Sequence, residues 1–155
     1  MMEIPSTTER VPAHTEEEAN RNILERTEEN ITFYKSCGTD AIERRLKELD
    51  REWDIERSLE ASASGFSLLG LTLGALVNRK WFIFPGIVTG FLLLHALQGW
   101  CPPLYLLRQW GIRTAREIDY ERYALKAARG DFEGLSGPGK DQSVAAGEIL
   151  QAVRR

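Results

Sequence analysis

Cys101 and His95 are the residues of this sequence whose types are best suited to chemistry. They lie close together near the end of an apolar stretch, with Gln98 between them. An imidazole titrates near neutral pH, and a thiolate is a strong nucleophile. Cys101 is therefore a candidate reactive thiol, and the positive charges of Arg108 and Arg113 would favour its thiolate. The alternative is a buried structural cysteine, which is the more frequent case.

A second set of polar residues belongs to the same region once the chain is folded back on itself. A sharp turn near residue 79 would place Gln98 opposite Glu60 and bring His95 close to Ser62 and Ser64. Polar groups within a membrane are costly unless they are paired, so we expect these residues to gather. One interpretation is an interhelical hydrogen-bond clasp, and the other is a protonatable or ligand-binding site.

The remaining chemistry-bearing residue types do not form a recognisable motif. Cys37 is not at C-x-x-C spacing from Cys101, and His95 with Cys101 supplies too few ligands for zinc. The sequence has no phosphate-binding loop, catalytic triad or paired-carboxylate motif, so we expect no enzymatic activity, metal or cofactor. With a net charge of −3 and no basic face, a nucleic-acid partner is not expected either.

Two apolar segments must position these residues. Residues 61–77 and 81–98 are nearly free of charge, and only Asn78, Arg79 and Lys80 separate them. Each is about 17 residues long, which is just enough to cross a bilayer as a helix. Trp81 suits a membrane–water interface, and Pro85 suits the first turn of a helix. The sequence predicts an all-α membrane protein with an antiparallel two-helix transmembrane hairpin at 61–107. A re-entrant hairpin and a soluble helical hairpin are the alternatives.

The distribution of Lys and Arg predicts the orientation. The turn contains only Arg79 and Lys80, whereas the flanks contain Arg44, Arg45, Lys47, Arg51, Arg57, Arg108, Arg113, Arg116, Arg122 and Lys126. Cytoplasmic segments carry the excess of positive residues, so both termini are expected in the cytoplasm. The expected partner of the hairpin is therefore the lipid bilayer.

Each apolar segment contains two glycines four positions apart: Gly70 with Gly74, and Gly86 with Gly90. This spacing lets two helices approach closely in lipid. The glycines would pack either within the hairpin or between two copies in a homodimer.

Flanking segments complete the predicted organisation. Residues 1–15 are expected to be a disordered tail and 16–60 cytoplasmic amphipathic helices, the first of which ends at Gly38. Asp40 and Glu43 resemble a capping box. It would begin one long helix that runs without interruption to Val77.

The segment after the hairpin is predicted to contain one helix and a tail. Residues 108–132 are expected to form an interfacial or cytoplasmic helix, which Thr114 and Glu117 would cap and Gly130 would end. Gly111 would end the short piece before it. Residues 133–155 are expected to be a flexible tail.

A family resemblance emerges at the end of the hairpin. An apolar helix ending in Gly99, followed by Cys101-Pro102, Leu104-Tyr105, Gly111-Ile112 and Thr114, resembles the YgaP-like transmembrane domain family. The likeness covers about residues 58–114. Pro103 and the charged flanking helices depart from the family pattern. The resemblance implies a bacterial inner-membrane hairpin, often dimeric, of unknown biochemical role. Some relatives carry a sulfur-transfer rhodanese domain, which would suggest sulfur handling at Cys101.

The leading functional hypothesis is a non-enzymatic membrane anchor or scaffold, or a self-associating hairpin. The amphipathic segment 40–60 would provide a contact surface for the chain itself, for a second copy or for a membrane or cytoplasmic protein partner. The alternative is a thiol-dependent small transport or sulfur-relay component that uses Cys101.

Overall fold

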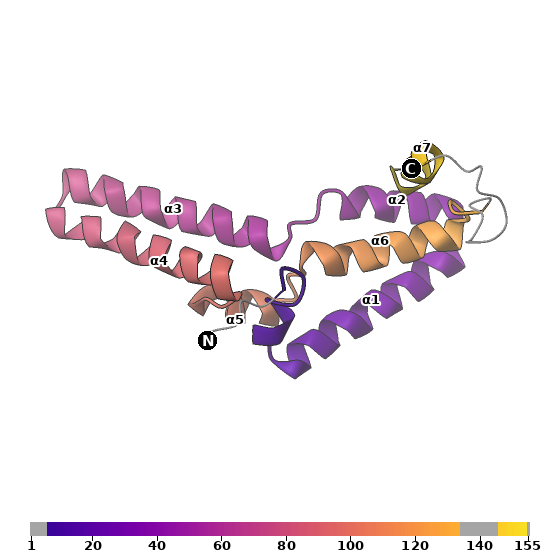
Figure 1. Ribbon diagram of the computed structural model, residues 1–155, viewed down its shortest axis with the longest axis horizontal. Helices are drawn as coiled ribbons and strands as arrows, with labels where there is room; N and C mark the ends of the chain where they lie inside the picture. The colour runs from indigo at the N-terminus through magenta and orange to yellow at the C-terminus, as the bar shows by residue number, and fades with distance from the viewer. Residues whose placement is uncertain (1–5, 134–145, 155) are drawn as a thin grey trace. The chain divides into compact units, whose positions relative to one another are not determined.

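The computed structural model describes residues 6–133 and 146–154, and every regular element in them is a helix, as the sequence predicted (Figure 1). The elements are η1 (Pro12–His14), α1 (Glu17–Cys37), α2 (Thr39–Leu49), α3 (Ile55–Leu76), η2 (Arg79–Phe82), α4 (Ile83–Gln98), α5 (Pro102–Gln109), α6 (Ala115–Arg129) and α7 (Ala146–Arg154).

The chain divides into two compact units. Unit 1 comprises Met1–Arg26 and Trp53–Ile118, and unit 2 comprises Thr27–Glu52 and Asp119–Arg155. Unit 1 contains η1, α3, η2, α4 and α5. Unit 2 contains α2 and α7, and the boundaries between the units fall within α1 and α6.

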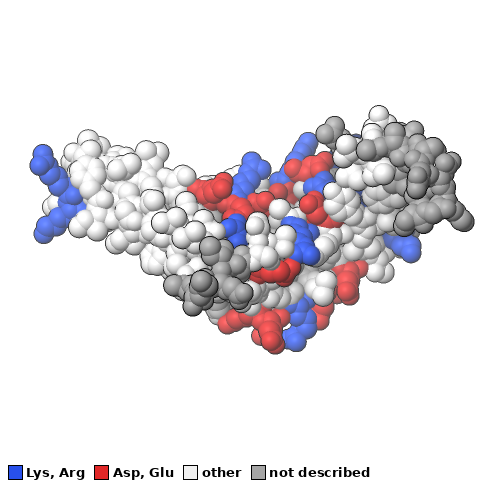
Figure 2. Space-filling view, viewed as in Figure 1, with Lys and Arg blue, Asp and Glu red and all other residues white. Residues whose placement is uncertain are grey.

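α3 and α4 lie side by side and are joined through η2 (Figure 1). Both α3 and the η2–α4 segment are long and apolar enough to cross a membrane. Only 17% of the apolar 18-residue stretch of the first, and 11% of that of the second, is buried. Figure 2 shows the pair as almost entirely uncharged, with basic side chains at the tip, where η2 carries Arg79 and Lys80. The helices therefore turn most of their apolar side chains outward, unlike the core helices of a water-soluble protein.

The two glycine pairs have different surroundings. A Cβ atom at Gly70 would lie 2.8 Å from Cδ of Pro85, and one at Gly74 would lie 2.7 Å from Cδ1 of Phe82. At Gly86 and Gly90, a Cβ atom would meet nothing within 4 Å. The first pair thus allows α3 and α4 to approach closely, whereas the second pair lies on an open face of α4.

The predicted uninterrupted helix over 40–77 is wrong, because the chain leaves helical geometry between α2 and α3. The side chain of Asp54 accepts a hydrogen bond from the Arg57 backbone N–H at 2.8 Å and so caps α3. The N–H of Ile55 donates to the carbonyl of Arg113 at 2.8 Å, and Ile55 is completely buried. An aspartate that caps a new helix, together with this long-range bond, outweighs the helical periodicity of the sequence.

The ends of the other helices follow local signals, with one exception. Thr114 and Glu117 form the predicted reciprocal capping box, with N···O distances of 2.7 and 3.2 Å. Gly38, Gly111 and Gly130 follow α1, α5 and α6, each with a positive φ. Asp40, however, does not cap α2. That helix already begins at Thr39, and no side chain caps it.

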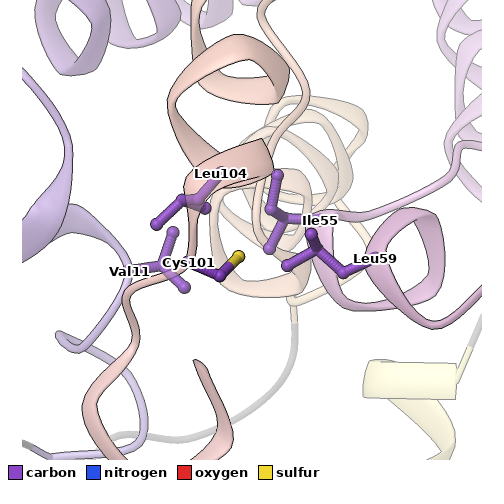
Figure 3. Close-up of a cluster of buried hydrophobic side chains, with 5 residues drawn as sticks. All are labelled: Val11, Ile55, Leu59, Cys101 and Leu104. Atoms are coloured by element: carbon purple, nitrogen blue, oxygen red, sulfur yellow. The ribbon is translucent and has the colours of Figure 1, made fainter. Parts of the chain in front are cut away.

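The segments predicted as tails contain ordered structure where they are described. Residues 6–15 form turns and η1, and Val11 is buried in unit 1 against Ile55, Leu59, Cys101 and Leu104 (Figure 3). α7 falls within the predicted C-terminal tail, and residues 134–145 of that tail lie outside the described residues. The polar composition of the N-terminal segment predicted disorder, because composition does not indicate that one apolar side chain, Val11, packs in a buried position.

The apolar face of α2 is already covered. Ile42, Leu46 and Leu49 are buried, although the segment 40–60 was expected to present a contact surface. Within unit 2, Phe33, Tyr120 and Tyr123 are exposed aromatic side chains.

Candidate functional site

Cys101 is positioned by two adjacent backbone features at the end of α4. Gly99 adopts a left-handed conformation (φ +81°), and its N–H donates to the carbonyl of His95 at 2.7 Å. A Cβ atom at Gly99 would collide with the backbone of Arg10, so this position requires glycine. Cys101 then stands at the N-cap of α5, whose first two residues are Pro102 and Pro103.

The thiol of Cys101 contacts an imidazole that in turn contacts a carboxylate. Cys101 Sγ lies 3.7 Å from His95 Nδ1, and His95 Nε2 lies 3.2 Å from Glu56 Oε2. We name these three residues the Cys–His–Glu cluster. Arg10 extends it, since its Nη2 donates to Glu56 Oε1 at 2.7 Å and its Nη1 donates to the carbonyl of Ala96 at 2.7 Å.

Burial is graded along this series. Cys101 and His95 are 3% and 1% exposed, while the side chains of Glu56 and Arg10 are partly exposed. In Figure 3 the sulfur of Cys101 points toward the side chains of Ile55 and Leu59. The thiol therefore lies at the apolar end of the cluster, and the ion pair between Glu56 and Arg10 lies at its hydrated end.

This arrangement can move a proton from sulfur. A thiol beside an imidazole whose other nitrogen is held by a carboxylate is the usual geometry for activating a cysteine nucleophile. The N-terminus of α5 places the positive end of a helix dipole at Cys101, which favours an anion there. Pro102 and Pro103 have no N–H groups, so the first turn of α5 offers no amide donors at these two positions to bind an oxyanion.

An apolar groove adjoins the thiol. It has a volume of about 50 Å³ and is lined by side chains of α3, α4 and the start of α5, among them Leu59, Ala63, Phe66, Val88, Leu92 and Cys101. Ser62 is a polar residue of the lining, and its hydroxyl donates to the carbonyl of Ser58 at 2.7 Å. The groove therefore offers carbon surface to a ligand and little hydrogen bonding.

The predicted site residues are only partly brought together. The structure joins Cys101 to His95, but Glu60 is exposed on α3 and the carboxylate beside His95 is that of Glu56. Gln98 is half-buried near the end of α4. Glu56 precedes Glu60 by four residues, so both lie on one face of the helix, and sequence spacing alone does not choose between them. No sequence pattern indicated that Arg10 belongs to this site, because its partners Glu56 and Ala96 are distant in the chain.

Arg108 makes different contacts from those expected. It is 2% exposed and donates to both carboxylate oxygens of Glu117, at 2.7 and 2.8 Å, and to Asn20 Oδ1 at 2.8 Å. Burial alone would raise the pKa of Glu117, but hydrogen bonds from Arg108 and Thr114 hold that pKa below its usual value. The hydrogen bonds of Arg108 thus stabilise unit 1 around α5 and the start of α6.

Comparisons of the chain with family models, with curated proteins and with solved structures give no match. Across residues 6–133 and 146–154, no group of three or more His, Cys, Asp or Glu side chains is arranged to hold a metal ion. The function must therefore be argued from the apolar helix pair and from the Cys–His–Glu cluster.

Proposed function

We propose that this chain is a multi-pass protein of a bacterial inner membrane, anchored by an antiparallel transmembrane hairpin of α3 and α4. The outward-facing apolar side chains of both helices carry the proposal. The candidate spans contain 22 and 20 residues. At about 1.5 Å per residue they extend roughly 33 and 30 Å, which matches a hydrocarbon core of about 30 Å.

Interfacial residues support this placement at both ends of the hairpin. Trp81 is exposed beside the turn, and Trp100 is exposed beside the opposite end. The guanidinium of Arg57 lies 4.4 Å from the ring centroid of Trp53, where α3 begins. Tryptophan and arginine favour the lipid headgroup region, and the excess of basic residues on the flanks favours cytoplasmic termini.

The proposed role is that of a non-enzymatic anchor or scaffold. The hairpin would hold unit 2 at the membrane, where exposed Phe33, Tyr120 and Tyr123 provide surface for a membrane or cytoplasmic protein partner. A homodimer is the other form of this proposal, with Gly86 and Gly90 as the open close-packing positions.

Cysteine labelling tests the topology. Cys37 is exposed and reports on the flank in a Cys101→Ser background, and a Lys80→Cys variant that also carries Cys37→Ser and Cys101→Ser reports on the turn. A membrane-impermeant maleimide is applied to intact spheroplasts and to inside-out vesicles. We expect Cys37 to react only in inside-out vesicles and the cysteine at position 80 to react only in spheroplasts. Reaction of both from the same side would exclude a hairpin that spans the membrane, and extraction of the protein by alkaline carbonate would exclude an integral anchor.

A second candidate function is favoured by the Cys–His–Glu cluster. In this proposal Cys101 carries out thiol-dependent chemistry, as in a small transport or sulfur-relay component, with His95 as the proton acceptor. Replacing Cys101 by Ala separates the two candidates, because anchoring and partner binding would survive this change and thiol chemistry would not.

A further inference from the structure

We propose that α5 lies in the headgroup region of the bilayer that holds the hairpin, with its exposed side against the lipid. We name this side the outer face of α5, and it consists of Tyr105, Leu106, Gln109 and the C-cap residue Trp110. The inference rests on the proposed membrane anchor and adds a second, shallower contact with lipid. It depends on the coincidence of two features, an exposed face without charge and a charged residue that is turned inward.

The polarity of α5 is the reverse of that of a helix on a water-soluble surface. Trp110 is 71% exposed, and Tyr105 and Leu106 are each 50% exposed. Positions 105 and 109, like 106 and 110, are four residues apart, so they lie on one side of the helix. Arg108 is the only charged residue of α5, and it is buried on the other side. A helix that faces water turns its charged residues outward and its apolar residues inward.

The contacts of the buried side fix this orientation. Leu104 is 1% exposed and belongs to the buried cluster around Cys101. Arg108 donates to both carboxylate oxygens of Glu117. A rotation of α5 that hid its outer face would expose Leu104 and separate Arg108 from Glu117. The outer face therefore stays exposed unless something outside the chain covers it.

The position of α5 favours a membrane as that cover. α5 begins at the end of the α3–α4 pair opposite the turn (Figure 1). Leu97 and Trp100 are exposed there, so apolar surface continues from the proposed span to the outer face. Exposed apolar patches mark contacts with membranes or proteins, and this continuity selects the membrane.

The residue types of the outer face set its depth in the bilayer. The side chains of Trp110 and Tyr105 each join an aromatic ring to a polar group, and Gln109 adds an amide. Such groups favour the boundary between headgroups and acyl chains, where the ring is buried and the polar group stays hydrated. We therefore expect α5 to lie at this boundary, as interfacial helices do.

The contact should not depend on the charge of the lipid. Attraction between basic residues and anionic headgroups is weakened by salt, whereas burial of apolar surface is not. The outer face has no charged residue. Trp110 should therefore lie at the same depth in vesicles of phosphatidylcholine and in vesicles that also contain phosphatidylglycerol, at low and at high salt.

Fluorescence of single tryptophans in the full-length protein tests the depth. One variant keeps Trp110 and a second keeps Trp81, and the other tryptophans of each are replaced by Phe. The vesicles contain phosphatidylcholine that is brominated either near the headgroup end or near the methyl end of its acyl chains. We expect Trp110 to lose most of its emission to the shallow bromine atoms and less to the deep ones.

A matched pair of substitutions tests the outer face itself. In the variant that keeps Trp110, Leu106→Glu adds a charge to the outer face, and Ala115→Glu adds the same charge at an exposed position of α6. Leu106→Glu should reduce quenching of Trp110 by bromine and increase quenching by acrylamide in the water. Ala115→Glu should change neither. Equal effects of the two substitutions would overturn the role of the outer face.

The remaining outcomes separate this inference from the anchor on which it rests. If bromine quenches Trp81 but not Trp110, the inference is overturned and the anchor is retained, and acrylamide then tells whether water or protein covers Trp110. If bromine quenches neither tryptophan, both proposals are overturned. Quenching of Trp110 that requires phosphatidylglycerol and disappears at high salt would also overturn the inference, because it would assign the contact to basic residues elsewhere.

Discussion

The α3–α4 pair and the helices of unit 2 are held together by different forces. In the pair, Gly70 and Gly74 allow aromatic and proline side chains to contact the helix backbone. In unit 2, Glu121 is completely buried and its carboxylate accepts from Arg45 Nε at 2.7 Å. Burial alone would lower the pKa of Arg45, but the hydrogen bond and charge of Glu121 raise it.

We propose that the α3–α4 pair is surrounded by lipid and unit 2 by water, and this difference in solvent explains the difference in packing. In lipid there is no hydrophobic gain from bringing apolar helices together, so association relies on close van der Waals packing at small residues. In water, the burial of apolar residues such as Ile42 and Leu49 drives association, and charged groups that are buried with them must be paired.

The largest expected effect is in unit 2. Glu121→Gln removes the buried one of three carboxylates that pair with Arg45, while Glu48 and Glu52 remain at 3.1 and 3.8 Å. The free energy of local unfolding should fall by about 3 kcal/mol, as for loss of a buried hydrogen bond to a charged group. Amide hydrogen exchange of α2 measures this loss. The matched control is Lys47→Gln, which removes an exposed ion pair with Glu43 and should leave exchange unchanged. Equal effects of the two variants would show that the buried Arg45–Glu121 pair stabilises unit 2 no more than the exposed Lys47–Glu43 pair does.

The second prediction concerns pH. Because the folded-state pKa of Glu117 is lowered, its contribution to stability is fully present well above the ordinary glutamate pKa of 4.5 and is lost as the pH falls through the folded pKa. The protection factors of amides in α5 and at the start of α6, which correct exchange rates for their intrinsic pH dependence, should therefore fall on acidification below about pH 4.5. Glu117→Gln should be less stable at neutral pH and should show a weaker pH dependence. An unchanged acid response in this variant would assign the effect to another carboxylate.

The third prediction contrasts the two glycine pairs. Gly74→Leu should destabilise the α3–α4 pair by about 2 kcal/mol, because the added side chain would overlap the ring of Phe82. Gly90→Leu, on the open face of α4, should leave the pair intact. Unfolding in mixed micelles measures both. If Gly86 and Gly90 form a dimer contact, Gly90→Leu will also reduce energy transfer between labelled copies in vesicles.

The smallest expected effect is at the start of α3. Asp54→Ala removes the side-chain cap and should cost about 1 kcal/mol. Faster amide exchange at Ser58, whose N–H donates to the carbonyl of Asp54, would report the loosened first turn. Asp54→Asn, which keeps a capping oxygen, should restore most of the protection. Equal loss in both variants would attribute the effect to the charge of Asp54 and not to the cap.

Much of the fold, but only part of the candidate site, could be predicted from the sequence. The capping box of Thr114 and Glu117 is a local pattern and was predicted. Cys101 and His95 were each predicted as candidate residues, but their contact was not, because it depends on the turn at Gly99 that ends α4. Glu56 was not predicted as the partner of His95, because helical spacing alone allows Glu60 equally well. Arg10 was missed because its contact with Glu56 joins segments far apart in the chain.

The sequence by itself determined the features that depend on neighbours within a few residues. These are the helical class, the two apolar segments, and the glycines that follow α1, α5 and α6. The tertiary structure alone decided that the chain leaves helical geometry before Asp54 and that Gly70 and Gly74, but not Gly86 and Gly90, face the other helix. Helix propensity and capping act over one or two turns. Which side chain meets which partner depends on packing between distant segments, and no local pattern encodes it.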